Sequence, residues 1–214
     1  MNTTILATLL EVSDITYGKY LITKDILYSK INKNDILSII EQAINCGKDV
    51  AKRTKKKYLV EEFREYLSSM GMEVEEKKEQ GISEFVCFGE YTPPNHITVY
   101  TDNIKKGDSI VNSMKFPKLT TTPFNDVITA HELFHHIETT DEQLFVNKYK
   151  IDLWKVFGYT HQSRLTSLSE IAAMSFAKEL LQLVYNPTAL NVILMYPYDR
   201  ETAISIYEDI ISNS

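Results

Sequence analysis

The sequence contains only two cysteines, and this scarcity excludes some kinds of site. Cys46 and Cys87 lie far apart and form no C-x-x-C pair, so we expect neither a disulfide framework nor a cysteine-based structural zinc site. Reduced thiols are typical of cytoplasmic proteins. The cytoplasm is therefore the expected location of the chain.

Long apolar runs are absent as well. No stretch approaches the roughly 18 apolar residues of a membrane-spanning helix, so no membrane span is expected. Residues 5–10 are apolar, but the run is short and no basic segment precedes it. The start of the chain therefore does not have the pattern of a signal peptide.

The chain also lacks an excess of positive charge. Its 23 Lys and Arg residues are outnumbered by 29 Asp and Glu residues, giving a formal net charge of −6. Direct binding to nucleic acid is not expected, because it requires a basic surface. The one basic run, residues 52–57, is either a solvated helix face or a docking patch for an acidic partner.

The 214 residues suit one domain, or one domain with an appended N-terminal part.

Histidine is scarce too, but three of the five histidines fall within residues 131–136, where His131, Glu132 and His135 form an H-E-x-x-H motif. On a helix, residues four apart share a face, so both imidazoles can reach one metal ion. Catalytic Zn²⁺ binds imidazole nitrogen and keeps one position open for water, on which Glu132 could act as general base. Pro123 and Asp126 are typical of a helix start, which supports a helical motif. The alternative is two core histidines with satisfied N–H groups.

A third protein ligand is expected further along the chain, and Glu170 is the best candidate. It lies in residues 167–181, whose apolar spacing predicts a second buried helix. Small alanines in that segment would let the two helices approach closely. The alternative is local, because Ser167 and Glu170 also form an S-x-x-E capping box. Manganese or iron would fit the spacing, but zinc is the expected metal.

Three other polar residues are further candidates for a place at the metal site. Glu138 lies on the same helix face as His131 and is expected either to orient a ligand imidazole or to be a solvated helix end. His136 points about 100° away from His135 and is expected to pack or lie at the surface. His96 is expected to be a loop residue and not a ligand.

Together these motifs resemble the ImmA/IrrE family of metallopeptidases. The resemblance rests on A-H-E-L-x-H at residues 130–135 and E-x-x-A-x-x-F-A-x-E-L-L at residues 170–181, and it covers roughly residues 58–185. It implies His131, His135 and Glu170 as zinc ligands and Glu132 as the catalytic carboxylate. It also suggests a regulatory protein, such as a transcriptional repressor, as substrate, although the chain shows no helix-turn-helix module.

The chain departs from the family pattern in two places. Phe134 stands where the family has glycine, which would alter packing behind the metal. About 35 residues separate His135 from Glu170, which implies an inserted segment. A capping box at residues 140–143 predicts that a helix running to Gly158 fills this segment and covers the cleft. The donor that stabilises the oxyanion is left open between Tyr149, Tyr159 and His161.

The remaining patterns predict helices around a small sheet. A helical stripe begins at Asn34 and should end or bend near Gly47, and a second helix should span residues 57–70. Two short helices should follow Asn186 and Asp199. Period-two alternation predicts strands at residues 72–75, 85–88 and 97–100. Residues 1–33 suggest only a strand pair or an irregular arm.

From these elements we expect an α+β, zincin-like fold with a three-stranded sheet packed on helices and the metal site between two helices. Residues 1–56 would form an N-terminal region, helical or irregular, packed on a metallopeptidase domain at residues 57–214. The expected function is a zinc-dependent endopeptidase, with residues 97–101 as the sheet edge that binds the peptide. The alternative is a zincin-like module that binds a protein partner with little or no hydrolysis. The sequence leaves the oligomeric state open.

Overall fold

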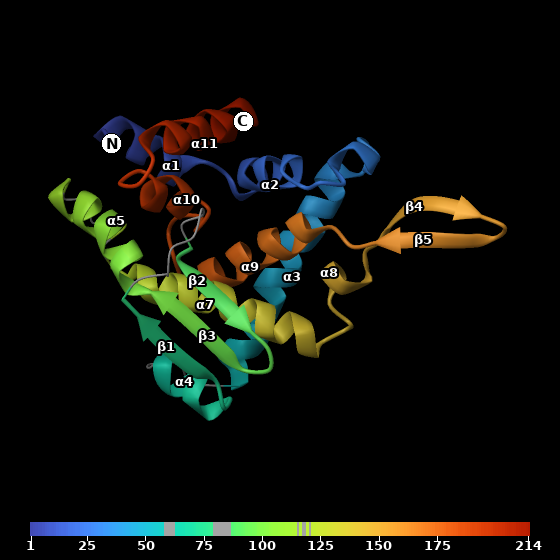
Figure 1. Cartoon of the computed structure of the whole chain (residues 1–214), viewed down its shortest axis with the longest axis horizontal. Helices are drawn as coiled ribbons and strands as arrows, with labels where there is room; N and C mark the ends of the chain where they lie inside the picture. Colours follow the sequence, from blue (N-terminus) through green and yellow to red (C-terminus); the bar gives the residue numbers. More distant parts are fainter. Residues whose placement is uncertain (58–62, 79–86, 115, 117–118, 120) are drawn as a thin grey trace.

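The structure is a computed structural model that describes residues 1–57, 63–78, 87–114, 116, 119 and 121–214 (Figure 1). In chain order the elements are α1 (Thr3–Glu11), α2 (Asp14–Thr23), η1 (Tyr28–Lys30), α3 (Ile36–Lys57), α4 (Phe63–Ser69), β1 (Glu73–Lys77), β2 (Gly89–Thr92), β3 (His96–Tyr100), α5 (Thr101–Ser113), α7 (Phe124–Thr140), α8 (Phe145–Lys148), β4 (Ile151–Val156), β5 (Tyr159–Ser163), α9 (Thr166–Leu180), α10 (Ala189–Met195) and α11 (Arg200–Ser212).

The main elements form successive layers. A sheet of order β1-β3-β2 packs on α7, α7 packs on α9, and α9 packs on α3 (Figure 1). Strand β3 pairs in parallel with β1 and antiparallel with β2. The expected α+β fold with a small sheet on helices is confirmed. No helix among the described residues is long and apolar enough to cross a membrane.

The predicted strand positions need two corrections. Residues 97–100 do form a strand, but β3 lies between β1 and β2, so residues 97–101 are not a sheet edge. Of the strand predicted at 85–88, residues 85 and 86 lie outside the described part of the chain, and Cys87 and Phe88 precede β2. Strand β2 begins at Gly89, where the backbone lies very close to α7.

The N-terminal part is helical, so the expectation of a strand pair or irregular arm was wrong. Asn2 and Ser13 cap α1 and α2 by accepting hydrogen bonds from the backbone N–H groups of Ile5 and Thr16. Within α2, Tyr17 and Tyr20 are buried at helical spacing. Burial against α3 and α9 therefore overrides the strand preference of these β-branched and aromatic residues.

Helix α3 neither ends nor bends at Gly47, contrary to expectation, and continues to Lys57. Gly47 allows α3 and α9 to pack closely, because a Cβ atom at this position would lie 2.1 Å from the carbonyl oxygen of Ala172 in α9. The helix predicted at 57–70 starts later than expected, because residue 57 ends α3 and α4 spans Phe63–Ser69; residues 58–62 lie outside the described residues. Helix α4 is followed by Gly71, whose positive φ of 72° fits the predicted stop.

The segment between α7 and α9 differs most from the predicted structure. It forms the short helix α8 and a β4–β5 hairpin that projects from the body of the molecule, instead of a helix covering the cleft (Figure 1). The hairpin turn has Phe157 and Gly158 at φ values of 47° and 82°, as a two-residue hairpin turn requires. The predicted cap at residues 140–143 does not form, because α7 extends through Thr140.

The C-terminal expectations are confirmed. Helix α10 follows Asn186, and α11 starts after Asp199, whose side chain accepts a hydrogen bond from the backbone N–H of Thr202. Helices α2 and α3 contact α9 directly. The division of the chain at residue 56 stays a prediction.

Candidate metal centre

Helices α7 and α9 bring together the three side chains that the motifs single out. The Nε2 atoms of His131 and His135 lie 3.1 Å apart. One carboxylate oxygen of Glu170 lies 3.3 Å from Nε2 of His131, and the other lies 3.5 Å from Nε2 of His135. Within the described residues this His-His-Glu group is the one whose ligand atoms cluster as a metal ion requires.

These separations are short enough for the three residues to share one metal ion. Zinc at about 2.0–2.1 Å from each of three ligand atoms holds those atoms roughly 3.3–3.4 Å apart. The distance of 3.1 Å between the two Nε2 atoms is close to that value. The two Nε2 atoms lie 3.3 and 3.5 Å from different oxygens of Glu170, and one ligand atom from each residue lies within 4.8 Å of the others. Two imidazole nitrogens and a carboxylate are also ordinary ligands of a divalent metal. The group is therefore suited in residue type and position to hold a metal ion.

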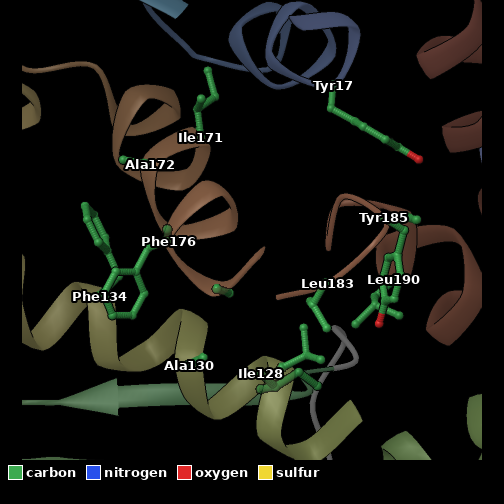
Figure 2. Packing of buried hydrophobic residues seen from close by; sticks show 14 of the residues in the cluster. Tyr17, Ile128, Ala130, Phe134, Ile171, Ala172, Phe176, Leu183, Tyr185 and Leu190 are labelled. Atoms are coloured by element: carbon green, nitrogen blue, oxygen red, sulfur yellow. The ribbon is translucent and has the colours of Figure 1, made fainter. Parts of the chain in front are cut away.

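Phe134 sets the packing behind the two histidines. Its side chain is fully buried and its ring lies 5.6 Å from that of Phe176 in α9 and 6.2 Å from that of His135. Figure 2 shows Phe134 and Phe176 meeting between α7 and α9, near Ala172. Phe134, which is larger than the glycine of the family pattern, thus fills the interface between α7 and α9 instead of blocking the metal group.

The capping box that was the alternative role of Ser167 and Glu170 does not cap α9. The side chain of Asp25 accepts hydrogen bonds from the backbone N–H of Ser167, at 2.9 Å, and from the hydroxyl of Thr166, at 3.4 Å. Burial acts to raise the pKa of Asp25, but these hydrogen bonds outweigh it and hold the pKa below its usual value. Because a distant carboxylate serves as cap, the Glu170 side chain is free to face the histidines.

Glu138 takes the orienting position that was one of its two expected roles. Its carboxylate lies 3.2 Å from Nδ1 of His135 and accepts a hydrogen bond of 2.5 Å from the hydroxyl of Ser169. A carboxylate at Nδ1 directs Nε2 of the same ring toward the metal. The sequence did not indicate a role for Ser169, because its contact with Glu138 joins residues on two different helices. Nδ1 of His131, in contrast, is buried with no hydrogen-bond partner among the described residues.

We expect Ser169→Ala to weaken zinc binding by about tenfold, the lower end of the range for losing a residue that supports a metal ligand. Without the serine hydroxyl, Glu138 holds the His135 ring less firmly. Competition with a chromophoric chelator would measure the affinity. Ser109→Ala is the matched control, since Ser109 is exposed on α5 and its hydroxyl donates to the Lys105 carbonyl. Equal affinity in the two variants would contradict the orienting role.

His131 and Glu170 within the group form a pair of opposite charge. Burial acts to lower the pKa of His131, but Glu170, and after it Glu132 and Glu138, raise this pKa to about 9. Burial acts to raise the pKa of Glu170, and His131 followed by His135 lowers it to about 2. These shifts favour an imidazolium at His131 and a carboxylate at Glu170.

We expect zinc binding at pH 7 to release about one proton per chain. His131 has to lose its proton to become a ligand, and its pKa of about 9 lies above the working pH. Protons thus compete with zinc, so affinity should fall about tenfold for each pH unit below that pKa. Titration calorimetry in two buffers with different ionisation enthalpies would count the protons. Binding heats that are the same in both buffers would contradict this expectation.

Glu132 lines a cavity together with His131 and Glu170. The start of β2 lies against this residue: a Cβ atom added to Gly89 would come within 3.3 Å of a Glu132 carboxylate oxygen and 2.3 Å of the Ile128 side chain. A larger residue here would have to displace the Ile128 side chain, so glycine lets the strand lie this close to α7. The role of Gly89 was not predicted, because the sequence does not show that the strand crosses the motif helix there.

The other polar residues singled out in the sequence lie elsewhere. His136 contacts the hydroxyl of Tyr91 and the carbonyl of Pro94, and His96 begins β3 and lies 3.2 Å from Glu75. Of the three candidate oxyanion donors, Tyr159 and His161 lie on the hairpin, where His161 stacks on Trp154 and the Tyr159 ring contacts Trp154 at a tilt. Tyr149 packs on Phe145. None of the three is among the described residues that line the cavity with Glu132.

Comparisons of the chain with protein-family models, with curated proteins and with solved structures find no match. The motifs and the geometry therefore support a coarser statement than the family resemblance. The chain carries a His-His-Glu group, from an H-E-x-x-H helix and a second helix, that is arranged as in zincin-like metal sites.

Proposed function

We propose that the chain is a zinc-dependent endopeptidase. One observation carries the proposal: ligand atoms of His131, His135 and Glu170 lie within 4.8 Å of one another, and Glu132 lines the adjoining cavity. Three protein ligands with an acidic residue beside the open position are the parts of a metallohydrolase. A structural zinc site would instead have a fourth protein ligand and no cavity.

Each residue would have a distinct role. Zinc held by the two histidines and Glu170 would polarise the peptide carbonyl and lower the pKa of a bound water toward about 7. Glu132 would accept the proton of the water that attacks the carbonyl carbon and pass it to the leaving amine. Glu138 and Ser169 would hold the His135 ring in its ligating orientation.

Strand β2 offers a place for an extended peptide. It pairs with β3 on one side, and no other described strand pairs with its second edge. Its first residue, Gly89, lies beside Glu132. A peptide added at this edge would gain main-chain hydrogen bonds and would run past the metal group. A protein substrate in the cytoplasm, such as the transcriptional repressor suggested by the family resemblance, would suit this mode of binding.

A binding module with little hydrolysis is the second candidate, and one observation favours it. The three expected oxyanion donors, Tyr149, Tyr159 and His161, are not among the described residues lining the cavity. Without such a donor, the metal alone would have to stabilise the oxyanion. A module of this kind would still bind zinc and a peptide at β2.

Digestion of a proteome-derived peptide library by the zinc-loaded chain would test the proposal. Mass spectrometry should detect new peptide ends that depend on zinc and disappear when zinc is removed with a chelator. A library that stays intact, while the same protein holds one zinc per chain and retains peptides in pull-downs, would favour the binding module and overturn the peptidase.

A further inference from the structure

The β4–β5 hairpin carries an unusual amount of exposed apolar surface. Four of the nine large hydrophobic side chains that are exposed among the described residues lie on it: Trp154, Val156, Phe157 and Tyr159. Phe157 is fully exposed, and the other three are at least half exposed. The hairpin projects from the body of the molecule (Figure 1), and its two strands pack chiefly on each other. A cluster of exposed apolar side chains of this kind indicates a contact surface.

The register of the two strands gathers these side chains on one face. Trp154 lies opposite His161, and Val156 lies opposite Tyr159. Because side chains alternate along a strand, these four residues share a face of the hairpin. The ring centre of Trp154 lies 5.1 Å from that of His161 and 5.9 Å from that of Tyr159, as a shared face requires. The hairpin is thus a wedge with one apolar face and an apolar tip.

Phe157 stands at the tip against the local preference of the backbone. Its φ of 47° lies in the left-handed region, which asparagine and glycine adopt far more readily than an aromatic residue does. Before a glycine such as Gly158, asparagine is the usual residue in a turn of this kind. Packing within the chain does not explain the phenylalanine, because its side chain is fully exposed. A contact with something outside the chain does.

The hairpin and its base are basic, although the chain as a whole is acidic. Residues 148–164 contain four Lys and Arg residues and one acidic residue, whereas the formal net charge of the chain is −6. Lys148, Lys150 and Arg164 flank the hairpin at its base, and Lys155 lies near its tip. None of the four forms an ion pair with a described carboxylate, although two glutamates line the same hollow as the three at the base. These charges are therefore available to an anionic partner.

The order of side chains along the hairpin matches the layers of an anionic bilayer. Phe157 and Val156 are at the tip, Trp154 and Tyr159 follow on the strands, and most of the basic residues lie at the base. Apolar side chains favour hydrocarbon, Trp and Tyr rings favour the membrane–water interface, and basic residues are attracted to anionic head groups. A convex arm with a fully exposed tip also suits a medium that it can enter, because a flat protein surface would cover only the tip.

We propose that the β4–β5 hairpin is a peripheral membrane anchor, which inserts Phe157 and Val156 into the surface of a bilayer that contains anionic phospholipids. Such a contact reaches only about 5–10 Å into the boundary between head groups and acyl chains, so it needs no membrane-spanning helix. The proposal depends neither on the metal nor on the proposed peptidase activity, since none of the hairpin residues belongs to the His-His-Glu group.

The base of the hairpin is fastened to the helix that carries the two histidines. The side-chain amide of Asn147 donates hydrogen bonds to the carbonyls of Glu138, at 2.7 Å, and Asp141, at 3.0 Å. Arg164, just after β5, donates a hydrogen bond to the side-chain oxygen of the same asparagine. Insertion of the hairpin would therefore hold the metal group close to the membrane surface.

Trp154 is the only tryptophan of the chain, so its fluorescence reports directly on the proposed contact. The full chain is mixed with vesicles of phosphatidylcholine alone and with vesicles of equal parts phosphatidylcholine and phosphatidylserine. With the anionic vesicles, Trp154 emission should shift to shorter wavelength and the chain should float with the lipid. Binding to phosphatidylcholine alone should be at least about tenfold weaker, because each basic residue near an anionic surface strengthens binding about fivefold.

Two variants make the test specific to the hairpin. Phe157→Asn removes the apolar tip and keeps the turn, because asparagine before Gly158 favours this conformation. Its binding to the anionic vesicles should be at least about tenfold weaker than that of wild type, the loss expected when a buried phenylalanine is removed. Val184→Asn is the matched control, because Val184 is 66% exposed and follows the end of α9, whereas the hairpin precedes its start. It should bind as wild type does.

Three results would overturn the proposal. The first is that anionic vesicles at low salt neither bind the chain nor shift Trp154 emission. The second is that Phe157→Asn binds the vesicles as tightly as wild type, which would place the contact elsewhere on the chain. The third is that Trp154 emission shifts with protein concentration alone and sedimentation shows dimers, which would assign the hairpin to a second copy of the chain.

Discussion

Replacing Glu132 with glutamine is expected to reduce peptide hydrolysis by about 10²–10⁴-fold, the usual contribution of a general base. Glutamine has the same shape but cannot accept the proton of the attacking water. Glu132 does not belong to the converging His-His-Glu group, so zinc should remain bound. Turnover of a cleaved peptide and zinc content by mass spectrometry would be measured on the same preparation.

Glu208→Gln is the matched control, because Glu208 lies exposed on α11 and is not among the residues that line the cavity. It should hydrolyse the peptide at the wild-type rate. Full activity of Glu132→Gln would remove this residue from the mechanism. Loss of zinc together with activity would instead indicate that Glu132 supports the metal group.

Gly47→Ala is expected to destabilise the folded chain by roughly 3 kcal/mol or more, at or above the usual cost of overpacking. The added methyl group would lie 2.1 Å from the carbonyl oxygen of Ala172 and 2.9 Å from the backbone nitrogen of Phe176. Both contacts are backbone atoms of α9, which cannot move aside alone. The better helix propensity of alanine offsets only about 1 kcal/mol, so the clash dominates.

The same substitution at Gly18 provides the comparison. A methyl group there would lie 2.4 Å from Cγ2 of Ile40, which belongs to a side chain that can shift. Urea unfolding should therefore show a smaller loss of stability for Gly18→Ala than for Gly47→Ala. If Gly47→Ala unfolds at the same urea concentration as wild type, α3 and α9 are not as closely packed as described.

The metal group was predictable because its signals are local. Helical spacing in the H-E-x-x-H run places His131 and His135 on one face, and the pattern around Glu170 predicts a second buried helix. The structure brings these three side chains together. The supporting contacts could not be predicted, because Ser169 meets Glu138 across two helices and Asp25 caps α9 from more than 140 residues away.

The errors in the fold also arose where tertiary contacts override local preference. Gly47 has the local character of a helix end, but it lies where α9 leaves no room for a side chain. The capping box at residues 140–143 suggested a helix up to Gly158, whereas residues 151–163 pair as two strands around a tight turn. The central position of β3 depends on a parallel pairing with β1, which alternation in the sequence does not reveal.

The most direct test of the account is the metal content per chain of wild type and Glu170→Ala, purified side by side without added metal. Glu170 contributes the only ligand from α9, at 3.3 and 3.5 Å from the two histidines. We expect about one zinc per wild-type chain and loss of most of it in the variant. Wild-type protein that stays free of metal even after incubation with zinc would contradict the account.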